Sequence, residues 1–408
     1  MTRMTTYVRS AEAARLLGVS PATLYAYVSR GRISRLRAAD GRTSLFAVDE
    51  IDALRTASRR TDPTPRPTID VQIASSITRL ADDGVELRGL ALTDLQREHH
   101  FEDIAELLWT GQLPNDTVWP LPEPTDVAAV VTPLAAVVTP PQAVKPIGRL
   151  IIAATVLAGL HQDDDAAQAA RRLLAVAPAV LGARSGTGEP ATASDLQVSV
   201  PDPGYAGRLA SVWRDPPGPE LVAAIDAALV LLADHELATS TLAVRIAASV
   251  RSSPYTAIVA GLATVEGALH GSAAAHAHRF LDECLVDEPS TVVARARSER
   301  RRIPGFGHKV YRHEDPRFAP LLETVRRLAP DDIRLDVIDV VLAEVLRAVP
   351  TQPNVDFALG ALSWIAGLPD DVPIFAVARI AGWAAHYDEE LGEPPVRFRG
   401  LARTPARA

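Results

Sequence analysis

The pattern of apolar and polar positions divides the chain into a short mixed N-terminal part and a long helical body. From about residue 145 onward, apolar residues recur at helical spacing in Ala/Leu-rich stretches such as ELVAAIDAALVLLADHELATSTLAVRIAASV. Period-two alternation, typical of strands, is nearly absent, and the one strand expected in the body lies near Thr78–Leu87. These helices are too apolar for a thin surface layer. We therefore expect an all-α body with a large core or a subunit interface.

Residues 1–58 follow a different pattern, in which two short helices precede a hairpin. Ser20 and Pro21 are a typical helix start, because serine caps the first turn and proline needs no N–H there. Leu24 and Val28 lie one turn apart and are expected to pack inward. The face of this second helix that is expected to point away from the core carries Thr23, Tyr27 and Arg30.

A basic hairpin is expected after the second helix. Asp40–Gly41 is a strong turn signal, and RISRLRAADGRTSLF supplies the flanking strands. A closing helix over Val48–Ala57 completes the layout of a winged helix-turn-helix domain. The proline-rich segment 59–69 is expected to be a linker, and the stretch Pro114 to Pro146 to hold loops of the larger domain.

Composition limits the class of protein. The chain has 408 residues and a formal net charge of −8, and 47% of its residues are hydrophobic, so a large core is feasible. No apolar window reaches about 18 residues, and we expect no membrane span. The N-terminus lacks the apolar region of a secretory signal. The single cysteine, Cys284, allows neither an internal disulfide nor a thiolate metal site. We expect a cytoplasmic protein.

Charge is distributed unevenly along the chain. The first 60 residues contain eleven Arg, no Lys and five acidic residues, a net charge of +6, which leaves −14 for the remainder. A basic head on an acidic body indicates that the head binds a polyanion. Two alternatives are open for the head: a DNA-binding domain, or a small protein-interaction domain with a solvated arginine face.

The segment SAEAARLLGVSPATLYAYVSRGRI resembles the DNA-binding domain of the MerR and excisionase families, over about the first 57 residues. The resemblance implies that the second helix enters a major groove and that the wing contacts phosphates. The residues expected to contact DNA are Thr23, Tyr27, Arg30, Arg35, Arg37 and Arg42.

Three of the ten histidines lie in unusual surroundings. His235 lies in ADHELATST, inside an apolar helical run, and His270 lies in GALHGSA, beside a glycine. His308 lies in PGFGHKVYRHEDPRF, after Gly305 and Gly307. Flanking glycines would let a ligand approach the imidazole and let backbone N–H groups point at it. No histidines have a tight metal-ligand spacing with a carboxylate beside them, so we expect no metal.

Two charged residues are embedded in apolar segments. Asp356, in PNVDFALGAL, is either a helix cap or a base whose pKa is raised by its surroundings, and local sequence alone favours the cap. Arg379, in FAVARIAGWAAH, lies within an apolar helix. An unpaired charge there is costly, so Arg379 needs an anionic partner from the protein or from a ligand.

These segments, in this order, resemble the citrate synthase family over about residues 70–400. The matching motifs are SSITRLADDGVELRG, FEDIAELLWTGQLP, ADHELATST, GALHGSA, GFGHKVYRHEDPRF and PNVDFALGAL, with FAVARIAGWAAH and VRFRG as C-terminal arginine segments. The resemblance implies a two-domain helical fold that closes on its substrate. The large domain would comprise residues 70–265 and 351–408, and the small domain residues 266–350.

The resemblance also implies condensation of acetyl-CoA, or a related acyl-CoA, with oxaloacetate, followed by thioester hydrolysis. Asp356 would take the methyl proton, His270 would hold the thioester oxygen, and His308 would bind and protonate the keto oxygen. Acetyl-CoA would be a substrate, and no separate cofactor is expected. Arg397 would reach in from the partner subunit of a homodimer. The residues implied for binding are His235, Arg317, Arg379 and Arg397 for the 2-oxo dicarboxylate, and Arg312 and Lys309 for CoA.

The sequence departs from the family pattern at two positions near the implied site. The family commonly has Asn where this chain has Ala238 and Ala274, so two hydrogen-bonding side chains are lost. Three outcomes are open: a citrate synthase with an extra domain, an enzyme for another acyl-CoA or oxo acid, or a DNA-binding regulator that senses CoA esters or di- and tricarboxylates. The head is alternatively an anchor to a partner protein.

Overall fold

The computed structural model describes residues 7–17, 19–29, 33–38, 43–48, 50–51, 72–81, 84–137, 144–162, 164–182, 204–267, 270–308, 310–311, 314–349 and 351–399. Contacts divide the chain into two units, Met1–Ala74 and Ser75–Ala408. The parts of our predictions that lie outside the described ranges are Arg30, Arg42, Lys309, Arg312, the Asp40–Gly41 turn, residues 49 and 52–57 of the closing helix, and the linker 59–69.

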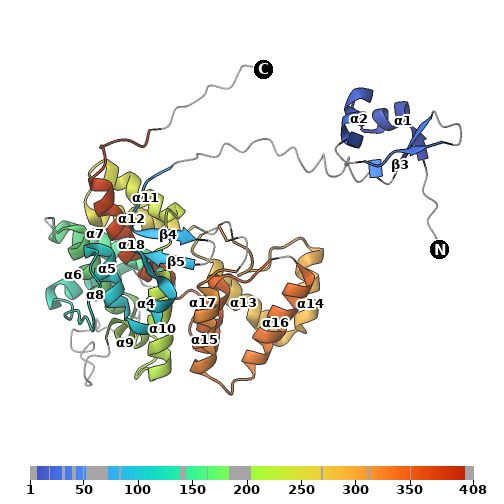
Figure 1. Ribbon diagram of the computed structural model, residues 1–408. Helices are drawn as coiled ribbons and strands as arrows, with labels where there is room; N and C mark the ends of the chain where they lie inside the picture. Colours follow the sequence, from blue (N-terminus) through green and yellow to red (C-terminus); the bar gives the residue numbers. More distant parts are fainter. Residues whose placement is uncertain are drawn as a thin grey trace. The chain divides into compact units, whose positions relative to one another are not determined.

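The N-terminal unit combines two helices with a three-stranded antiparallel sheet of order β1-β3-β2. The expected helix pair and hairpin strands are present, and the first strand was not expected. Val48, Glu50 and Ile51 are helical, as expected for the start of a closing helix. The described elements are β1 (Tyr7–Arg9), α1 (Ser10–Leu17), α2 (Pro21–Ser29), β2 (Leu36–Arg37) and β3 (Ser44–Ala47) (Figure 1).

A small core holds this unit together. Leu24 is fully buried and Val28 packs beside it, as expected. The Ser20 hydroxyl accepts the Thr23 N–H at 3.2 Å, so Ser20 caps α2 as expected. Tyr27, which we expected to point away from the core, packs against it. The prediction for Tyr27 was wrong because helical spacing does not show how far a long side chain can reach toward the core.

The body is built almost entirely of helices around one core, as the apolar pattern predicts. Its described strands are β4 (Thr78–Ala81), β5 (Gly84–Leu87) and β6 (Leu90–Ala91), which pair antiparallel in chain order where one strand was expected. Its described helices are α4 (Leu92–Glu98), α5 (Phe101–Thr110), α6 (Pro124–Val137), α7 (Pro146–Leu160), α8 (Ala166–Gly182), α9 (Gly204–Ala210), α10 (Pro219–Leu232), α11 (Thr239–Ser249), α12 (Pro254–Val265), α13 (Ala273–Val286), α14 (Pro289–Ser298), α15 (Phe318–Leu328), α16 (Arg334–Ala348), α17 (Val355–Ile365) and α18 (Ile374–Leu391).

The stretch Pro114 to Pro146, expected to hold loops, contains α6. Pro133 lies inside this helix, and Val130 and Leu134 on either side of it are fully buried. Tertiary burial of the apolar face therefore outweighs the hydrogen bond that proline cannot make.

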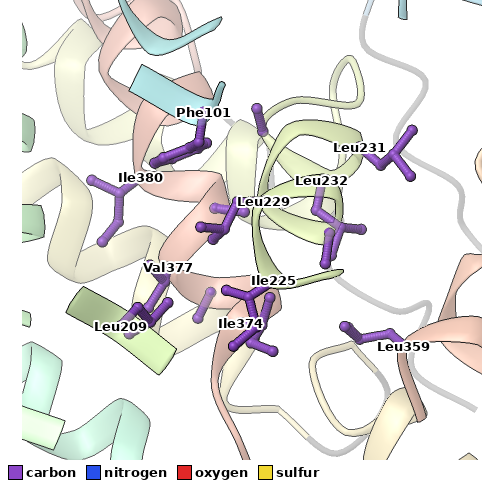
Figure 2. Close-up of a cluster of buried hydrophobic side chains, with 14 of the residues drawn as sticks. Phe101, Leu209, Ile225, Leu229, Leu231, Leu232, Leu359, Ile374, Val377 and Ile380 are labelled. Atoms are coloured by element: carbon purple, nitrogen blue, oxygen red, sulfur yellow. The ribbon is translucent and has the colours of Figure 1, made fainter. Parts of the chain in front are cut away.

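Helix α18 lies at the centre of the core. Ile374 of α18 lies beside Ile225 of α10, and Val377 and Ile380 of α18 belong to the same buried cluster as Leu229 of α10 (Figure 2). All five side chains are fully buried, so truncating any of them to alanine would cost about 2–5 kcal/mol. A rigid α18 fixes the position of Arg379, which lies in the same helix.

Helices α13 to α17 pack together, and α15 also packs against α10 (Figure 1). We predicted that the small domain ends at residue 350. Helix α17 follows this boundary in the sequence, but it packs against α13 and α15, which precede it. Closure of a small domain on substrate stays a prediction. In the described part of the chain, no helix combines the length and the apolar character that crossing a bilayer requires.

Candidate active site

The loop that carries His308 is hydrogen-bonded to the segment before α17. Gly307 N–H donates to the Gln352 carbonyl oxygen at 2.8 Å, and Asn354 N–H donates to the Gly305 carbonyl oxygen at 2.9 Å. The Asn354 side chain also donates to the Gly307 carbonyl oxygen at 2.7 Å. These bonds hold His308 beside the N-terminus of α17.

Gly305 and Gly271 are packed against the protein itself. A Cβ at Gly305, where φ is +76°, would lie 2.5 Å from the Phe357 Cβ. A Cβ at Gly271 would lie 2.3 Å from the Val265 carbonyl oxygen. We expected glycines here to make room for a ligand. Packing against the protein already requires glycine at both positions, and Gly271 also lines a pocket of about 290 Å³. They let the backbone next to each histidine approach a neighbouring element.

The imidazole of His308 has a defined neutral tautomer. Its Nδ1 accepts hydrogen bonds from the backbone N–H groups of Val310 at 3.1 Å and Tyr311 at 3.3 Å. An accepting Nδ1 places the ring proton on Nε2, which is then a donor. Burial and the Arg317 charge lower the pKa of His308, while Asp315 opposes them. His308 is therefore neutral near pH 7.

His235 follows α10 and contacts the same loop. Its Nε2 is 2.8 Å from the Tyr311 hydroxyl, and its ring centroid is 5.4 Å from that of His308. Burial, followed by the charges of Arg317 and Arg379, lowers the pKa of His235 well below its ordinary value. Two neutral imidazoles and a phenol therefore line one wall of the site.

Arg317 is engaged by a carboxylate of its own loop. Its Nε and Nη2 donate to the two oxygens of Asp315 at 2.9 Å each, and both side chains are buried. Asp315 also accepts the Val355 N–H at 3.0 Å, which ties the ion pair to α17. Burial alone would lower the pKa of Arg317, but the Asp315 charge produces a net rise, so Arg317 stays protonated.

Asp356 does not cap its helix. The cap of α17 is Asn354, whose side-chain oxygen accepts the Asp356 N–H at 3.0 Å. Burial raises the pKa of Asp356 to about 6, against the opposing charge of Arg317. The interpretation that local sequence favoured is therefore wrong, and this carboxylate has the raised pKa expected of a base.

Arg379 projects from α18 and is only 2% exposed. Its Nε and Nη1 make no hydrogen bond in the part of the chain that the structure describes. The Asp234 carboxylate is 3.8 Å from Nη1, and the Phe375 ring centroid is 5.0 Å from the guanidinium carbon. Burial lowers the pKa of Arg379 to about 10. A buried cation with two unused donors is suited to an anionic ligand.

His270 lies in the turn between α12 and α13. Its Nε2 is 2.9 Å from the Ser240 hydroxyl of α11, and its ring meets the Phe375 ring edge-on at 5.8 Å. Burial and then the Arg379 charge lower the pKa of His270. Phe375 thus contacts both His270 and Arg379. These contacts place His270 in the same site as Arg379.

The structure therefore brings together six of the seven residues that were predicted to act on substrate and lie within the described ranges. They are linked by direct contacts or by the electrostatic influence of Arg317 and Arg379: His235, His270, His308, Arg317, Asp356 and Arg379. Arg397 is the exception. Its Nε and Nη2 donate to the Glu390 carboxylate at 2.6 Å each.

Several neighbours of this group were not singled out from sequence. Asp315 lies two residues before Arg317, and an acidic residue this close to an arginine was the available signal. Tyr311, Ser240 and Phe375 had no signal, because their contacts come from distant segments. No three His, Cys, Asp or Glu side chains are grouped to hold a metal ion within the described residues.

The two alanine substitutions have local consequences. Ala238 is the N-cap residue of α11 and supplies no side-chain cap, where Asn would be a strong one. Ala274 lines a pocket of about 290 Å³ that also touches Gly271, Leu359 and Phe375. The region beside His270 is therefore more open than an Asn would leave it.

The head carries its candidate contacts near the hairpin strands. Arg35 and Arg37 are exposed at β2, and Tyr25 is 38% exposed on α2, edge-on to Phe46 at 6.3 Å. Thr23 is hydrogen-bonded to Ser20 at 2.9 Å. Tyr25 was not singled out from sequence.

The sequence profile described as "Citrate synthase, C-terminal domain" matches residues 70–399. The chain belongs to the citrate synthase family. It is therefore an enzyme of the condensing, acyl-transferring class, with the all-α fold that the motifs predicted. A second profile, described as a helix-turn-helix domain, matches residues 7–59, which confirms that fold for the head.

Curated relatives within the citrate synthase family have two different products in their names. Citrate synthase 2 of Bacillus subtilis is 31% identical over 351 residues, covering 78% of this chain and 90% of the relative. The 2-methylcitrate synthase of Mycobacterium tuberculosis is 30% identical over 322 residues, covering 74% of this chain and 80% of the relative.

Solved citrate synthases share the fold. The enzyme from Thermoplasma acidophilum, described as a ternary complex with carboxymethyl coenzyme A and oxaloacetate, superposes with a TM-score of 0.67 at 21% identity. The match covers 83% of this chain and 95% of that one. The enzyme from Thermotoga maritima also gives 0.67, at 24% identity over 84% and 94%.

Proposed function

We propose that this protein condenses an acyl-CoA, acetyl-CoA or a close relative such as propionyl-CoA, with oxaloacetate or a similar 2-oxo dicarboxylate. The acyl-CoA is a substrate, and no separate cofactor takes part. The observation that carries the proposal is the guanidinium of Arg379, buried with two unused donors, close to a carboxylate of raised pKa and two neutral imidazoles.

The chemical problem is a weak carbon acid. Asp356 takes a proton from the carbon next to the thioester carbonyl, and its raised pKa makes it a stronger base than an ordinary carboxylate. His270 Nε2 lies 2.9 Å from the Ser240 hydroxyl. With this hydroxyl as the donor, the ring proton of His270 lies on Nδ1. That N–H stabilises the thioester oxygen as the enol forms.

The enol carbon then attacks the keto carbon of the second substrate. His308, with its ring proton on Nε2, donates to the keto oxygen and delivers this proton as the carbon–carbon bond closes. A water molecule hydrolyses the thioester of the condensed product, and CoA leaves as the thiol. Lys309 and Arg312 would contact CoA.

The dicarboxylate is held by buried cations. Arg379 offers its unused donors to one carboxylate, and Arg317 and His235 contribute charge and a hydrogen bond. Arg397 reaches the site of the partner subunit in a homodimer, exchanging its bond to Glu390 for a substrate carboxylate.

A thiol-trapping assay of CoA release tests the proposal over a panel of acyl-CoAs and 2-oxo acids. Turnover is expected with at least one pair, and Asp356→Ala should abolish it. The matched control is Asp331→Ala, an exposed carboxylate between α15 and α16, which should keep wild-type turnover. No CoA release across the panel, or release that survives Asp356→Ala, would reject the proposal.

A second function is favoured by the helix-turn-helix domain. The head binds DNA through its basic surface, and ligand occupancy of the body regulates this binding. Gel retardation of the full chain, with and without CoA or citrate, tests it. No salt-sensitive retardation, together with loss of a bound protein on deleting residues 1–58, would point to a protein anchor instead.

A further inference from the structure

Asp234 lies directly before His235 and is the nearest carboxylate to Arg379. Its side chain is fully buried, and one wall around it is formed by the backbone of α18. A Cβ on Gly382 would lie 2.3 Å from Asp234 Oδ1, so glycine at that position is what admits the carboxylate. The close fit leaves Asp234 little freedom to turn.

The two oxygens of Asp234 have different surroundings. Oδ2 accepts three donors: the Thr78 hydroxyl at 2.5 Å, the Glu236 N–H at 3.1 Å and His386 Nε2 at 3.3 Å. Oδ1 makes no hydrogen bond within the described residues, and it is the oxygen that faces Arg379, at 3.8 Å. The carboxylate is thus held from one side and directs its free oxygen at the cation.

A second layer fixes His386. Its Nδ1 accepts from Arg245 Nη1 at 3.1 Å, which places its ring proton on the nitrogen that faces Asp234. Arg245 is buried and also donates to Glu390 at 2.8 Å and Glu389 at 2.6 Å. A buried network therefore orients Asp234 through His386.

We propose that Asp234 is a positioning residue for dicarboxylate binding, a counter-ion held away from Arg379 so that it supplies charge without occupying the donors. This inference rests on the proposed function. The physical reason is a conflict between two needs. A lone buried guanidinium is unstable, but a fully hydrogen-bonded partner would compete with the substrate. Arg317 in the same site shows the other arrangement, because its Nε and Nη2 donors are already hydrogen-bonded to Asp315.

Two variants separate the effect of the Asp234 charge from the effect of the hydrogen bonds that hold Asp234 in place. Asp234→Asn removes the charge with little change of shape. Arg379 then lacks its counter-ion and is held in place less firmly, so the Kd and the KM for oxaloacetate should rise about tenfold. The KM for the acyl-CoA should change less than about threefold. Thr78→Val keeps the charge but removes one donor from Oδ2. Two donors then remain on Oδ2, so the carboxylate is restrained less firmly, and the Kd for oxaloacetate should rise about 3- to 10-fold.

The alkaline limb of oxaloacetate binding gives an independent readout. The groups that act on Arg379 are Asp234, Arg317, Asp356 and Tyr311, and the wild-type pKa is about 10. Without the Asp234 charge, binding should fall at a lower pH than in the wild type. Asp126→Asn is the matched control: it removes a buried carboxylate that pairs with Arg172 and His161, residues outside the site. It should leave the Kd unchanged even where it lowers the Tm.

Calorimetric binding of oxaloacetate to the full chain keeps the two hypotheses apart. If the wild type does not bind oxaloacetate, the proposed function fails. If the wild type binds and Asp234→Asn binds equally well, or weakens both substrates alike, the inference about Asp234 is overturned. Loss of folding in both Asp234→Asn and Thr78→Val would also overturn it, because the carboxylate would then serve the fold.

Discussion

The head and the body both carry arginines for anions, but they hold them differently. Arg35 and Arg37 of the head are exposed at a short strand. Arg317 and Arg379 of the body are 3% and 2% exposed and are surrounded by carboxylates, imidazoles and aromatic rings. Exposed cations attract any polyanion at a distance and are screened by salt. Buried cations are fixed before the ligand arrives and select a small anion of one shape.

The comparison shows that burying arginines to select a ligand costs stability, whereas exposing them does not. The head keeps its charges solvated at little cost, and its core is a handful of residues. The body has to bury cations, and it keeps them with Asp315 and Asp234. The first carboxylate is bonded to its arginine and the second is not.

The largest effect is expected from Asp356, the base in the buried site. Asp356→Asn should lower kcat for CoA release by at least about 1000-fold, because the carbon acid then has no base of suitable pKa. DNA retardation by the same variant should be unchanged. Residual turnover within tenfold of wild type would mean that Asp356 is not the catalytic base.

Removing Arg317 should act on stability. Arg317→Gln leaves Asp315 buried without its partner, which costs about 3–5 kcal/mol of unfolding free energy. Chemical denaturation measures this, with Arg326→Gln as the control, since Arg326 pairs with Asp339 at the surface. A loss no larger than that of the control would contradict the difference between buried and exposed pairs.

Removing Arg379 should act mainly on binding. Arg379→Gln should weaken oxaloacetate about 100-fold in calorimetry, because the buried donors are lost. Its unfolding free energy should fall less than that of Arg317→Gln, since Arg379 is bonded to no carboxylate. Equal losses of stability in the two variants would remove the distinction between an engaged and an unengaged arginine.

The exposed arginines should give smaller effects that depend on salt. Replacing both Arg35 and Arg37 by alanine should weaken DNA binding about tenfold at moderate salt and reduce the salt dependence by about two ions. Arg15→Ala, an exposed arginine paired with Glu12, is the control. An unchanged salt slope would show that these residues do not contact phosphates.

The smallest effect concerns pH. The pKa of Asp356 is raised to about 6, so kcat/KM should fall as pH drops below about 6. Because the pKa is higher in the folded protein, the protonated carboxyl favours the fold at pH values below its ordinary pKa. This contribution is lost as the pH rises through about 6. Asp356→Asn should therefore raise the Tm at pH 8 but not at pH 4, as calorimetry can measure. A Tm that changes equally at both pH values would mean that the fold does not raise the pKa of this carboxylate.

The motifs predicted which residues meet, but the reasons given for some of them were incomplete or wrong. Gly305 and Gly271 were expected to admit a ligand, yet packing against Phe357 and Val265 is by itself enough to require glycine at both positions. For Asp356 the local sequence favoured a cap and the family resemblance implied a base, and the structure gives the cap to Asn354. Local sequence shows that a residue is unusual, but it does not show what fills the space around it.

The sequence by itself determined the all-helical body, the basic head and the set of histidines, arginines and carboxylate at the site. These follow from periodicity, charge and motifs, which are properties of neighbouring residues. Only the tertiary structure decided which donors stay unused. Asp315 and Arg317 are two residues apart and bond directly, whereas Asp234 follows α10, Arg379 lies in α18, and the two side chains stop 3.8 Å apart. That separation is set by the packing of α18 on α10 and by the hydrogen bond from Thr78 of β4 to Asp234, which no local pattern contains.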